Sequence, residues 1–492
     1  MDLYLASRRA RRIAAVLLLG LGACNAPRPV PQGPGPLRVH PQNPRYFTDN
    51  SGKAVYLTGS HTWANLQDIS GPSPKRFDYE AYLDLLEKYN HNFFRLWTWE
   101  HTIEASWAPD TTVLKFGPTL IYPRTGPGAA LDSLPRFDLS EFNQAHFDRL
   151  RSRVAEAGER GFYVMIMLFQ GWSIEKKGPA KEDPGAGNPW VGHPCNRANN
   201  INGIDGDPNG DGQGEETHML EVPAVTEMQE AYIRKVVDTV NDLDNVLYEI
   251  SNESNRNSTA WHYEMIDYLH GYEQGKPKQH PVVMTFQYQG GTNDDLFAGP
   301  AEAVSPNPGE NEQYRDAPPA SDGLKVILND TDHLWGIGGN AGWVWKSFLR
   351  GLNPMFMDPL KQLYYYPYLS GDGGLNPEWE AIRWSMGYTK AFAERMDLAG
   401  MTPRGELASS GYCLAKTGAE RPEYLVYLPE GGEVSVDLTG SPVPLAVELF
   451  DPARGVTTDV WQVHGGTRSS LTAPFAGPAV LYLHGAGQAD KE

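Results

Sequence analysis

The chain has 492 residues, of which 40% are hydrophobic and 21% are charged, so it can bury a large core and is not intrinsically disordered as a whole. The formal net charge of −19 argues against a protein that wraps nucleic acid or lies on anionic lipid. Three cysteines exclude a disulfide framework and a metal site built from cysteine clusters.

The N-terminus has the pattern of an export signal. Within residues 1–23, four arginines precede an apolar stretch, 13–21, that is too short to span a bilayer. The sequence LGAC at 21–24 resembles the bacterial lipobox, and this resemblance implies a lipid attached to Cys24. An ordinary cleaved signal followed by a chance cysteine is the alternative.

Residues 24–40 are rich in proline and are expected to form a semi-extended tether. Asn25 follows the lipobox cysteine, and the resemblance then implies outer-membrane sorting in a Gram-negative cell. We therefore expect an exported protein anchored to the bacterial cell envelope, with the lipid as its sole link to the membrane.

Short apolar runs alternate with helical patterns through most of the chain. The runs are 55–59 (VYLTG), 92–97 (NFFRLW), 162–168 (FYVMIML), 245–250 (NVLYEI), 281–286 (PVVMTF), 302–306 (EAVSP), 325–329 (KVILN) and 354–357 (PMFM). Segments with helical periodicity are 79–89, 144–157, 225–243, 261–270 and 378–396. This alternation predicts a parallel (β/α)8 barrel over residues 41–402, with a doubly wound open sheet as the alternative.

Beyond residue 402 the pattern changes to short alternating runs separated by Gly/Pro turns. The runs lie at 424–428, 433–438, 445–450 and 479–483. They predict a small β-sandwich over residues 403–492. Cys195 and Cys413 fall in different predicted domains, so we expect no disulfide between them.

Carboxylates follow two of the predicted barrel strands. In a (β/α)8 barrel the reactive groups lie at the C-terminal ends of the strands. Glu253 follows the fourth run, and Asp330 and Asp332 follow the seventh. Two carboxylates that flank a glycosidic oxygen are the minimum for glycoside hydrolysis. Strand alternation would place both aspartates on one face, and we favour Asp330 as the attacking residue. The alternative is that these acids are helix caps or turn formers.

The sequence YEISNE at 248–253 resembles the Asn-Glu motif of the clan of retaining (β/α)8 glycoside hydrolases. The resemblance implies that Glu253 is the general acid/base, that Asn252 contacts the 2-hydroxyl of the sugar, and that the nucleophile ends the seventh strand. VILND at 326–330 occupies that place. Arg95 is similar to the clan's second-strand arginine, which hydrogen-bonds the nucleophile.

Within this clan the likeness is closest to apiosidase-like (DUF4038-type) proteins, which share the opening segment 43–63 and a trailing sandwich with a collagen-binding label. One feature departs from the clan, whose nucleophile is glutamate rather than aspartate. Aspartate is one methylene shorter, so either the strand stands closer to the sugar or the mechanism is not double displacement. Retention implies carboxyl groups about 5–5.5 Å apart.

Polar and aromatic residues crowd the predicted strand ends, and sugar rings stack on flat apolar faces such as indoles. The expected substrate-binding residues are His61, Trp63, Arg95, Trp97, Trp99, Gln170, Trp172, Asn252, Gln287, His333 and Trp335. Two or three of the five tryptophans should touch substrate and the others pack in the barrel mouth. The two histidines could be zinc ligands, but neither strand offers a second ligand at suitable spacing, which favours hydrogen bonds to sugar hydroxyls.

Residues 205–216 match the spacing D-x-[DN]-x-[DN]-G-x5-E of a calcium loop. The expected ligands are Asp205, Asp207, Asn209, Asp211 and Glu216. We expect the ion to act as a structural brace and no cofactor to take part in catalysis. A glycine-rich solvated loop is the alternative.

The sequence thus predicts a glycoside hydrolase with an extracellular oligo- or polysaccharide substrate, and the resemblance to apiosidase-like proteins implies exo-action. A non-catalytic surface lipoprotein that binds carbohydrate or matrix is the competing hypothesis. No Gly-x-Ser-x-Gly elbow is present, which argues against an acyl hydrolase. A peptidase is disfavoured because the sequence offers no credible Ser/Cys triad or zinc pair.

Overall fold

The computed structural model describes residues 35–70, 76–102, 115–116, 120–176, 187–288, 290–360, 377–418 and 420–485. The chain divides into two units, Met1–Gly33 and Pro34–Glu492. The predicted signal, the lipidation site Cys24 and the first part of the tether lie outside the described residues.

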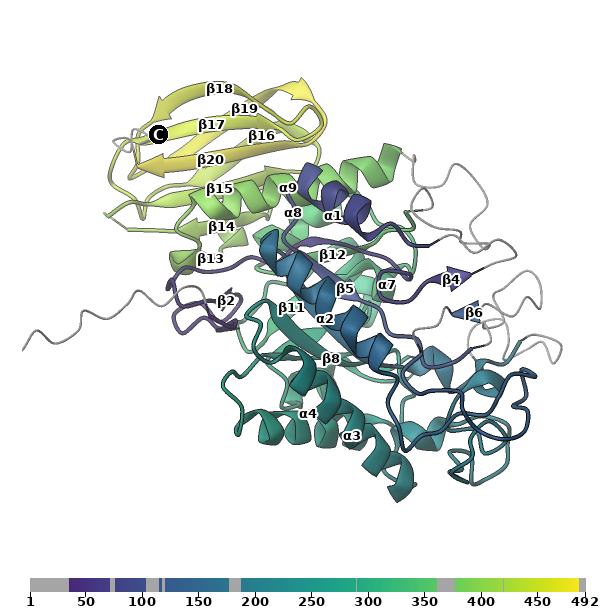
Figure 1. Cartoon of the computed structure of the whole chain (residues 1–492). Helices are drawn as coiled ribbons and strands as arrows, with labels where there is room; N and C mark the ends of the chain where they lie inside the picture. Colours follow the sequence, from purple (N-terminus) through teal and green to yellow (C-terminus); the bar gives the residue numbers. More distant parts are fainter. Residues whose placement is uncertain are drawn as a thin grey trace, which may run out of the picture. The chain divides into compact units, whose positions relative to one another are not determined.

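A parallel eight-stranded sheet lies at the centre of the larger domain of the second unit (Figure 1). Its strands in chain order are β3 (Gly59–His61), β5 (Phe93–Leu96), β7 (Tyr163–Gln170), β8 (Val246–Asn252), β9 (Val282–Thr285), β10 (Ala303–Ser305), β11 (Val326–Asp330) and β12 (Asn353–Met357). Neighbours in the sheet are neighbours in sequence, and β12 also pairs with β3. Where β3 and β5 meet, the Asn92 amide donates to the Thr58 carbonyl at 3.1 Å. The sheet is therefore a (β/α)8 barrel, and the doubly wound alternative is wrong.

Each of the eight apolar runs contributes a strand, but the first strand begins later than predicted. Residues 57 and 58 lie before β3 because their amides bond to side chains instead of a neighbouring strand. The Leu57 amide donates to Asn353 Oδ1, and the Thr58 amide donates to Asn92 Oδ1. This shift carries the strand on to His61 and places that side chain at the strand end.

Helices cover the outside of the barrel. The longer ones are α1 (Tyr79–Lys88), α2 (Gln144–Glu159), α3 (Pro223–Val240), α4 (Thr259–Glu273), α8 (Ala341–Leu349) and α9 (Pro377–Arg395). Three short helices are α5 (Asn293–Ala298), α6 (Gln313–Asp316) and α7 (Thr331–Leu334). The five predicted helical segments agree with α1–α4 and α9 to within three residues at each end.

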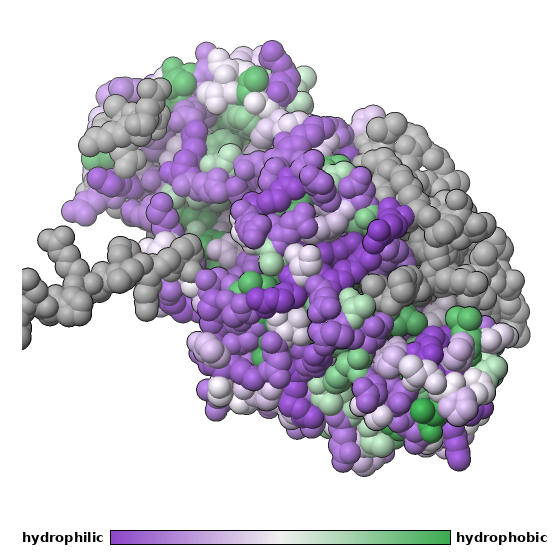
Figure 2. Space-filling view, viewed as in Figure 1, coloured by the Kyte–Doolittle hydropathy of each residue, from purple (hydrophilic) through white to green (hydrophobic). Residues whose placement is uncertain are grey.

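Helix α1 illustrates why these segments are helical. Asp78 caps its N-terminus by accepting from the Ala81 amide, and the buried residues Tyr79, Tyr82, Leu83 and Leu86 recur at the spacing of one helix face. The opposite face is polar. Figure 2 shows that this helix-covered side of the barrel is mainly hydrophilic. None of the helices among the described residues is both long and apolar enough to cross a bilayer.

The C-terminal part is a small β-sandwich. One sheet contains β13 (Thr402–Pro403), β14 (Cys413–Lys416), β15 (Glu423–Leu428), β17 (Leu445–Asp451), β18 (Val456–Val463) and β20 (Ala479–Gly485). The other pairs β16 (Gly431–Asp437) with β19 (Arg468–Ala476). Two further pairs, β1 (Arg38–Val39) with β2 (Phe47–Thr48) and β4 (Ile69–Ser70) with β6 (Lys115–Phe116), lie outside the barrel and sandwich sheets.

The sandwich and the barrel share a buried hydrophobic cluster. Trp345 of α8 and Phe392 of α9 pack with Tyr427, Phe450 and Val480 of the sandwich. The Trp345 and Tyr427 rings are stacked, with centroids 6.0 Å apart. Because large aromatic faces are buried on both sides, the sandwich is packed against the barrel rather than tethered to it.

Both described cysteines, Cys195 and Cys413, are buried free thiols. Cys195 belongs to a small cluster with Trp190, and Cys413 lies in the sandwich core. The prediction that no disulfide joins them is confirmed.

Candidate active site

A cleft of about 740 Å³ lies at the C-terminal ends of the barrel strands. Residues predicted from the sequence to form the site make up much of its lining: Trp63, Trp97, Trp99, Trp172, Asn252, Glu253, Gln287, Asp332, His333 and Trp335. They come from six different strand ends, which the closed barrel brings together.

Glu253 directly follows β8 and lies in the cleft lining. Its side chain accepts a hydrogen bond from Nε1 of Trp172, and the residue is only 5% exposed. Its backbone has φ = 50°, in the left-handed region that a non-glycine residue rarely adopts. Such strain is found at functional sites, where it sets the direction of a side chain.

Gly171 allows the neighbouring strand end to approach Glu253. A Cβ at position 171 would lie 2.1 Å from the Glu253 carbonyl oxygen. Any larger residue would therefore clash with the backbone of Glu253 unless that backbone moved. The absence of a side chain here lets β7 and β8 end side by side. Gln170 and Asn252, the last residues of these two strands, are paired in register.

The structure places the two candidate nucleophiles, Asp330 and Asp332, in different surroundings. Asp330 is fully buried and is absent from the cleft lining, whereas Asp332 lines the cleft. Strand β11 ends at Asp330, and Asp332 lies in α7, so the two acids are not on one strand face as predicted. The strand ends because Oδ1 of Asp330 accepts from the Asp332 amide at 3.0 Å and caps α7.

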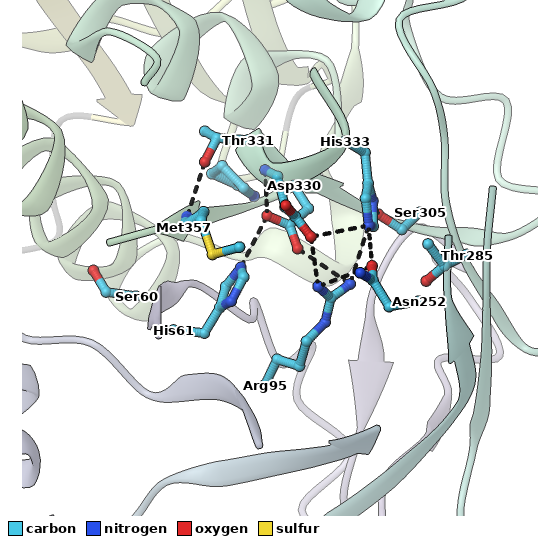
Figure 3. Close-up of polar contacts among 12 residues, drawn as sticks. Ser60, His61, Arg95, Asn252, Thr285, Ser305, Asp330, Thr331, His333 and Met357 are labelled. Atoms are coloured by element: carbon cyan, nitrogen blue, oxygen red, sulfur yellow. Dashed lines mark hydrogen bonds and ion pairs between the residues drawn. The ribbon is translucent and has the colours of Figure 1, made fainter. Parts of the chain in front are cut away.

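Arg95 connects the acids of the site. Its Nη1 lies 3.1 Å from Asp332 Oδ2, its Nη2 lies 3.4 Å from Asp330 Oδ2, and its Nε lies 2.8 Å from Glu249 Oε2. Figure 3 shows Arg95 and His61 reaching toward Asp330 from the first two strands of the barrel. Arg95 is fully buried. It therefore positions carboxylates, as its resemblance to the clan's second-strand arginine implies, and does not contact substrate, which was its other predicted role.

The guanidinium of Arg95 faces the carboxylates of Glu249, Asp330 and Asp332, and the pKa values of these acids shift in different directions. Burial would raise the pKa of Asp330, but His61 and Arg95 outweigh burial and hold it below its usual range. Burial raises the pKa of Asp332, and the negative charges of Glu253 and Asp330 add to this rise. Burial also raises the pKa of Glu249, against the opposing effect of Arg95. Diverging carboxyl pKa values are typical of acid/base sites.

The hydrogen bonds of His61 fix its tautomer. Trp97 Nε1 can only donate, and it lies 2.9 Å from His61 Nδ1, so that nitrogen is the acceptor. Nε2 then carries the proton and donates to Asp330 Oδ1 at 3.0 Å. Burial lowers the pKa of His61, which keeps the ring neutral.

His333 is also a neutral ring. Its Nε2 lies 3.0 Å from Asn252 Oδ1 and 3.2 Å from Arg95 Nη2, and its Nδ1 lies 2.7 Å from Ser305 Oγ. Burial lowers the pKa of His333 to about 3. Unlike His61, this residue lines the cleft, where it can contact a ligand.

Besides Arg95, two residues predicted to bind sugar do not line the cleft. His61 lies behind Trp97, where it contacts Asp330. Gln170 is buried, and its Oε1 accepts from the Trp172 amide at 3.2 Å and from Asn252 Nδ2 at 3.4 Å. Both side chains therefore position cleft residues.

Aromatic rings form much of the cleft lining. Trp97 and Trp99 are stacked with ring centroids 5.6 Å apart, and the ring centroids of Trp63 and Trp97 are 6.5 Å apart. The ring centroids of Trp172 and Tyr288 are 5.7 Å apart. The cleft therefore offers flat apolar faces around the carboxylates, as sugar-binding sites do.

Several residues of the site escaped the sequence analysis. Among them are Glu249 behind the cleft and Phe286, Tyr288, Asn307, Glu312, Arg315 and Met357 in its lining. Glu249 could have been found, because a carboxylate inside an apolar strand must be paired. The others lie at strand ends, in loops or, for Glu312 and Arg315, in short helices, where sequence offers no such signal.

Asp330, Asp332 and His333 have ligand atoms within 4.8 Å of one another, a spacing that could hold a metal ion. Arg95 already contacts all three residues, so the local charge is supplied by its guanidinium. The zinc alternative for the histidines is not supported, because Nδ1 and Nε2 of His61 are both engaged by protein groups.

The predicted calcium-loop residues are not part of the cleft lining. Asp207, Asn209, Asp211 and Glu216 take part in hydrogen bonds within the loop. Asp205 lies at its edge, where Oδ2 is 3.7 Å from Arg197 Nη1.

Comparisons with known proteins support the fold. Residues 116–296 match a family described as a domain of unknown function (DUF6298). No curated protein matches the chain. A solved structure described as a glycoside hydrolase has a TM-score of 0.58 at 12% identity and covers 92% of this chain and 97% of its own. A glycoside hydrolase family 5 structure from Bacteroides vulgatus has a TM-score of 0.61 at 14% identity, with coverage of 92% and 95%. These similarities confirm the predicted architecture. The likeness to apiosidase-like proteins stays a prediction.

Proposed function

We propose that this protein is a glycoside hydrolase in which Glu253 is the general acid/base and Asp332 is the nucleophile. The observation that carries the proposal is that these two acids line one aromatic cleft at the strand ends, with Glu253 close enough to raise the pKa of Asp332. The glycoside hydrolase structures with the same architecture support it.

In the first step Asp332 attacks the anomeric carbon while Glu253 gives its proton to the departing glycosidic oxygen. This breaks the C–O bond and forms a glycosyl ester on Asp332. In the second step Glu253 takes a proton from water, the water oxygen attacks the same carbon, and Asp332 leaves as a carboxylate. The mechanism retains configuration and requires carboxyl groups about 5–5.5 Å apart.

The short side chain of the nucleophile is compatible with this mechanism. Asp332 lies two residues beyond the last residue of β11, so the backbone of α7 carries it toward the cleft. Arg95 pairs with its Oδ2 and leaves the other carboxylate oxygen for attack. The positions of Asp330 and Arg95 thus compensate for the missing methylene.

Glu253→Gln tests the proposal with a panel of aryl pyranosides and furanosides of both anomers. We expect kcat to fall about 10²–10⁴-fold while sugar binding is retained. The loss should be smallest for aglycones that leave without protonation. Glu312→Gln is the matched control, since Glu312 lines the same cleft but its side chain is 55% exposed. Equal hydrolysis by Glu253→Gln and the unmodified protein would favour a surface binding protein instead.

The proposed substrate is a glycan outside the cell, from which a terminal sugar is removed. This part rests on the export pattern of residues 1–23 and on the resemblance to apiosidase-like proteins. Product analysis on an oligosaccharide should give monosaccharide from the first turnovers, whereas early release of longer fragments would contradict exo-action. Lipid attachment at Cys24 is tested by Cys24→Ser, which should release the protein from the membrane fraction.

A further inference from the structure

The loop 205–216 is built around the carboxylate of Asp207. Its Oδ1 accepts from the amides of Gly210 at 2.9 Å and Asp211 at 3.1 Å, and its Oδ2 accepts from the Gly212 amide at 2.9 Å. Gly210 and Gly212 have φ values of 73° and 84°. The chain therefore winds tightly around one acid, with Asn209 and Asp211 spaced two and four residues beyond it.

A second observation points to a ligand at this loop. Glu216 is only 7% exposed, and its Oε2 is buried without a hydrogen-bond partner among the described residues. Its Oε1 accepts from Nδ2 of Asn209, so the carboxyl group is directed at the loop. Burying a carboxylate oxygen without a partner is costly, and a bound cation removes that cost.

We propose that Asp207, Asn209, Asp211 and Glu216 bind a calcium ion. Four side chains with oxygen atoms, completed by a main-chain carbonyl and water, suit the six to eight oxygens that Ca²⁺ takes. Carboxylate oxygens of Asp207, Asp211 and Glu216 do not all lie within 4.8 Å of one another, so binding draws the loop closed around the ion.

This ligand set differs from the one that the sequence spacing predicts, which begins at Asp205. Oδ1 of Asp205 accepts from the Asp207 amide at 3.2 Å, its Oδ2 faces Arg197, and its side chain is 37% exposed. Three successive backbone amides point to Asp207 instead. Asp205 therefore lies outside the coordination sphere and provides a matched control.

The loop is connected to the segment that carries Glu253. It leads into the short 3₁₀ helix Glu215–His218. The Glu215 carbonyl accepts from Asn255 Nδ2 at 3.2 Å, and His218 Nδ1 lies 3.0 Å from Ser254 Oγ. These contacts hold the two residues that follow Glu253.

The loop also contacts the segment that follows Trp172. The Gly214 amide donates to the Ile174 carbonyl at 2.7 Å. Calcium at this loop therefore stabilises both partners of the Trp172–Glu253 hydrogen bond. This consequence for catalysis rests on the proposed function, whereas the binding of the ion does not.

Calcium binding is tested on the purified full-length chain after treatment with a chelator. Adding CaCl2 at about 1 mM should raise Tm by about 3–5 °C in the unmodified protein and in Asp205→Asn. Glu216→Gln and Asp211→Asn should show no rise. An unchanged Tm in the unmodified protein would overturn the site. Loss of the response in Asp205→Asn but not in Asp211→Asn would overturn the ligand set.

Terbium luminescence gives a second readout that does not depend on the stability of a variant. A Cβ at Gly214 would lie 2.2 Å from the Trp190 ring, so this indole lies against the loop and can transfer energy to a bound Tb³⁺. We expect sensitised Tb³⁺ emission that is lost when Ca²⁺ displaces the bound Tb³⁺. Glu216→Gln should show no such emission. Emission that persists in Glu216→Gln would contradict the assignment.

Activity then tests the connection to Glu253. Chelation should lower kcat several-fold at a temperature where the chain stays folded, and CaCl2 should restore it. If Tm responds to calcium but kcat does not, the connection is wrong while the site stands. Because Tm and luminescence need no substrate, failure of the glycosidase proposal leaves the calcium result readable.

Discussion

The side chain of Asp330 caps the backbone of Asp332, with Oδ1 of the first 3.0 Å from the amide nitrogen of the second. A fully buried acid thus sets the position of an acid that faces the cleft. The two residues have different tasks, although both lie at the end of the seventh barrel strand.

This division predicts opposite outcomes for chemical rescue. Asp332→Ala should lower kcat by about 10³-fold or more, and azide should restore turnover because a small anion can occupy the place of the missing nucleophile. Asp330→Ala should lose about 10–10²-fold through misplacement of Asp332, without rescue. The measurement is kcat with an activated aryl glycoside, followed by identification of any glycosyl azide. Rescue of Asp330→Ala alone would reverse the assignment.

The fold could be predicted from sequence because an apolar run overlaps or directly precedes each barrel strand. The convergence of Arg95, Asn252, Glu253 and the tryptophans followed from the closure of a parallel barrel, whose strands all end at one face. None of these conclusions required knowledge of side-chain packing.

The choice between the two aspartates did require such knowledge. It depends on whether β11 continues past Asp330, and a two-residue difference decides which carboxylate meets the cleft. The capping preference of aspartate was a signal for the strand end, but alternation was an equally valid interpretation. The burial of His61 and Gln170 likewise depends on contacts with Trp97 and Asn252, which are distant from them in sequence.

The charge of Glu253 should be visible in the pH dependence of the reaction. Asp332 must be ionised to attack, and burial raises its pKa above the ordinary value of 3.8. The acidic limb of kcat/KM therefore lies at a higher pH than for an exposed aspartate. Glu253 must hold its proton to act as the acid, so Glu253→Gln, which mimics the protonated form, should leave the acidic limb in place and remove the basic limb.

This change is measured with a substrate whose aglycone leaves without protonation, so that the variant still turns over. Glu312→Gln alters a cleft carboxylate that is not among the causes of the Asp332 shift, and both of its limbs should match those of the unmodified protein. A basic limb that persists in Glu253→Gln would mean that Glu253 is not the group that must hold a proton.

Gly171→Ala tests the close approach of the two strand ends. The added methyl group would lie 2.1 Å from the Glu253 carbonyl oxygen, so the backbone that directs the acid must move. We expect kcat/KM to fall about 10–10²-fold, because small displacements of a catalytic group are costly. Gly271→Ala in α4 is the control, since its Cβ would meet open space and alanine favours a helix. Kinetic constants for Gly171→Ala equal to those of the control would refute the positional role.

The raised pKa of Asp332 also predicts that this residue lowers the stability of the fold while it serves activity. The pKa of Asp332 is higher in the folded chain than in the unfolded chain, so ionising Asp332 opposes folding. This destabilisation is absent at pH values below the unfolded pKa of about 3.9, grows as pH rises through the folded pKa, and is complete above it. Asp332→Asn removes it, while Arg95 keeps its pairs with Glu249 and Asp330. The variant should therefore be about 0.5–2 kcal/mol more stable at neutral pH and no more stable than the unmodified protein in acid. Thermal unfolding across pH measures the difference. A variant that is less stable at neutral pH would show that the Arg95–Asp332 ion pair outweighs the cost of burying the charge.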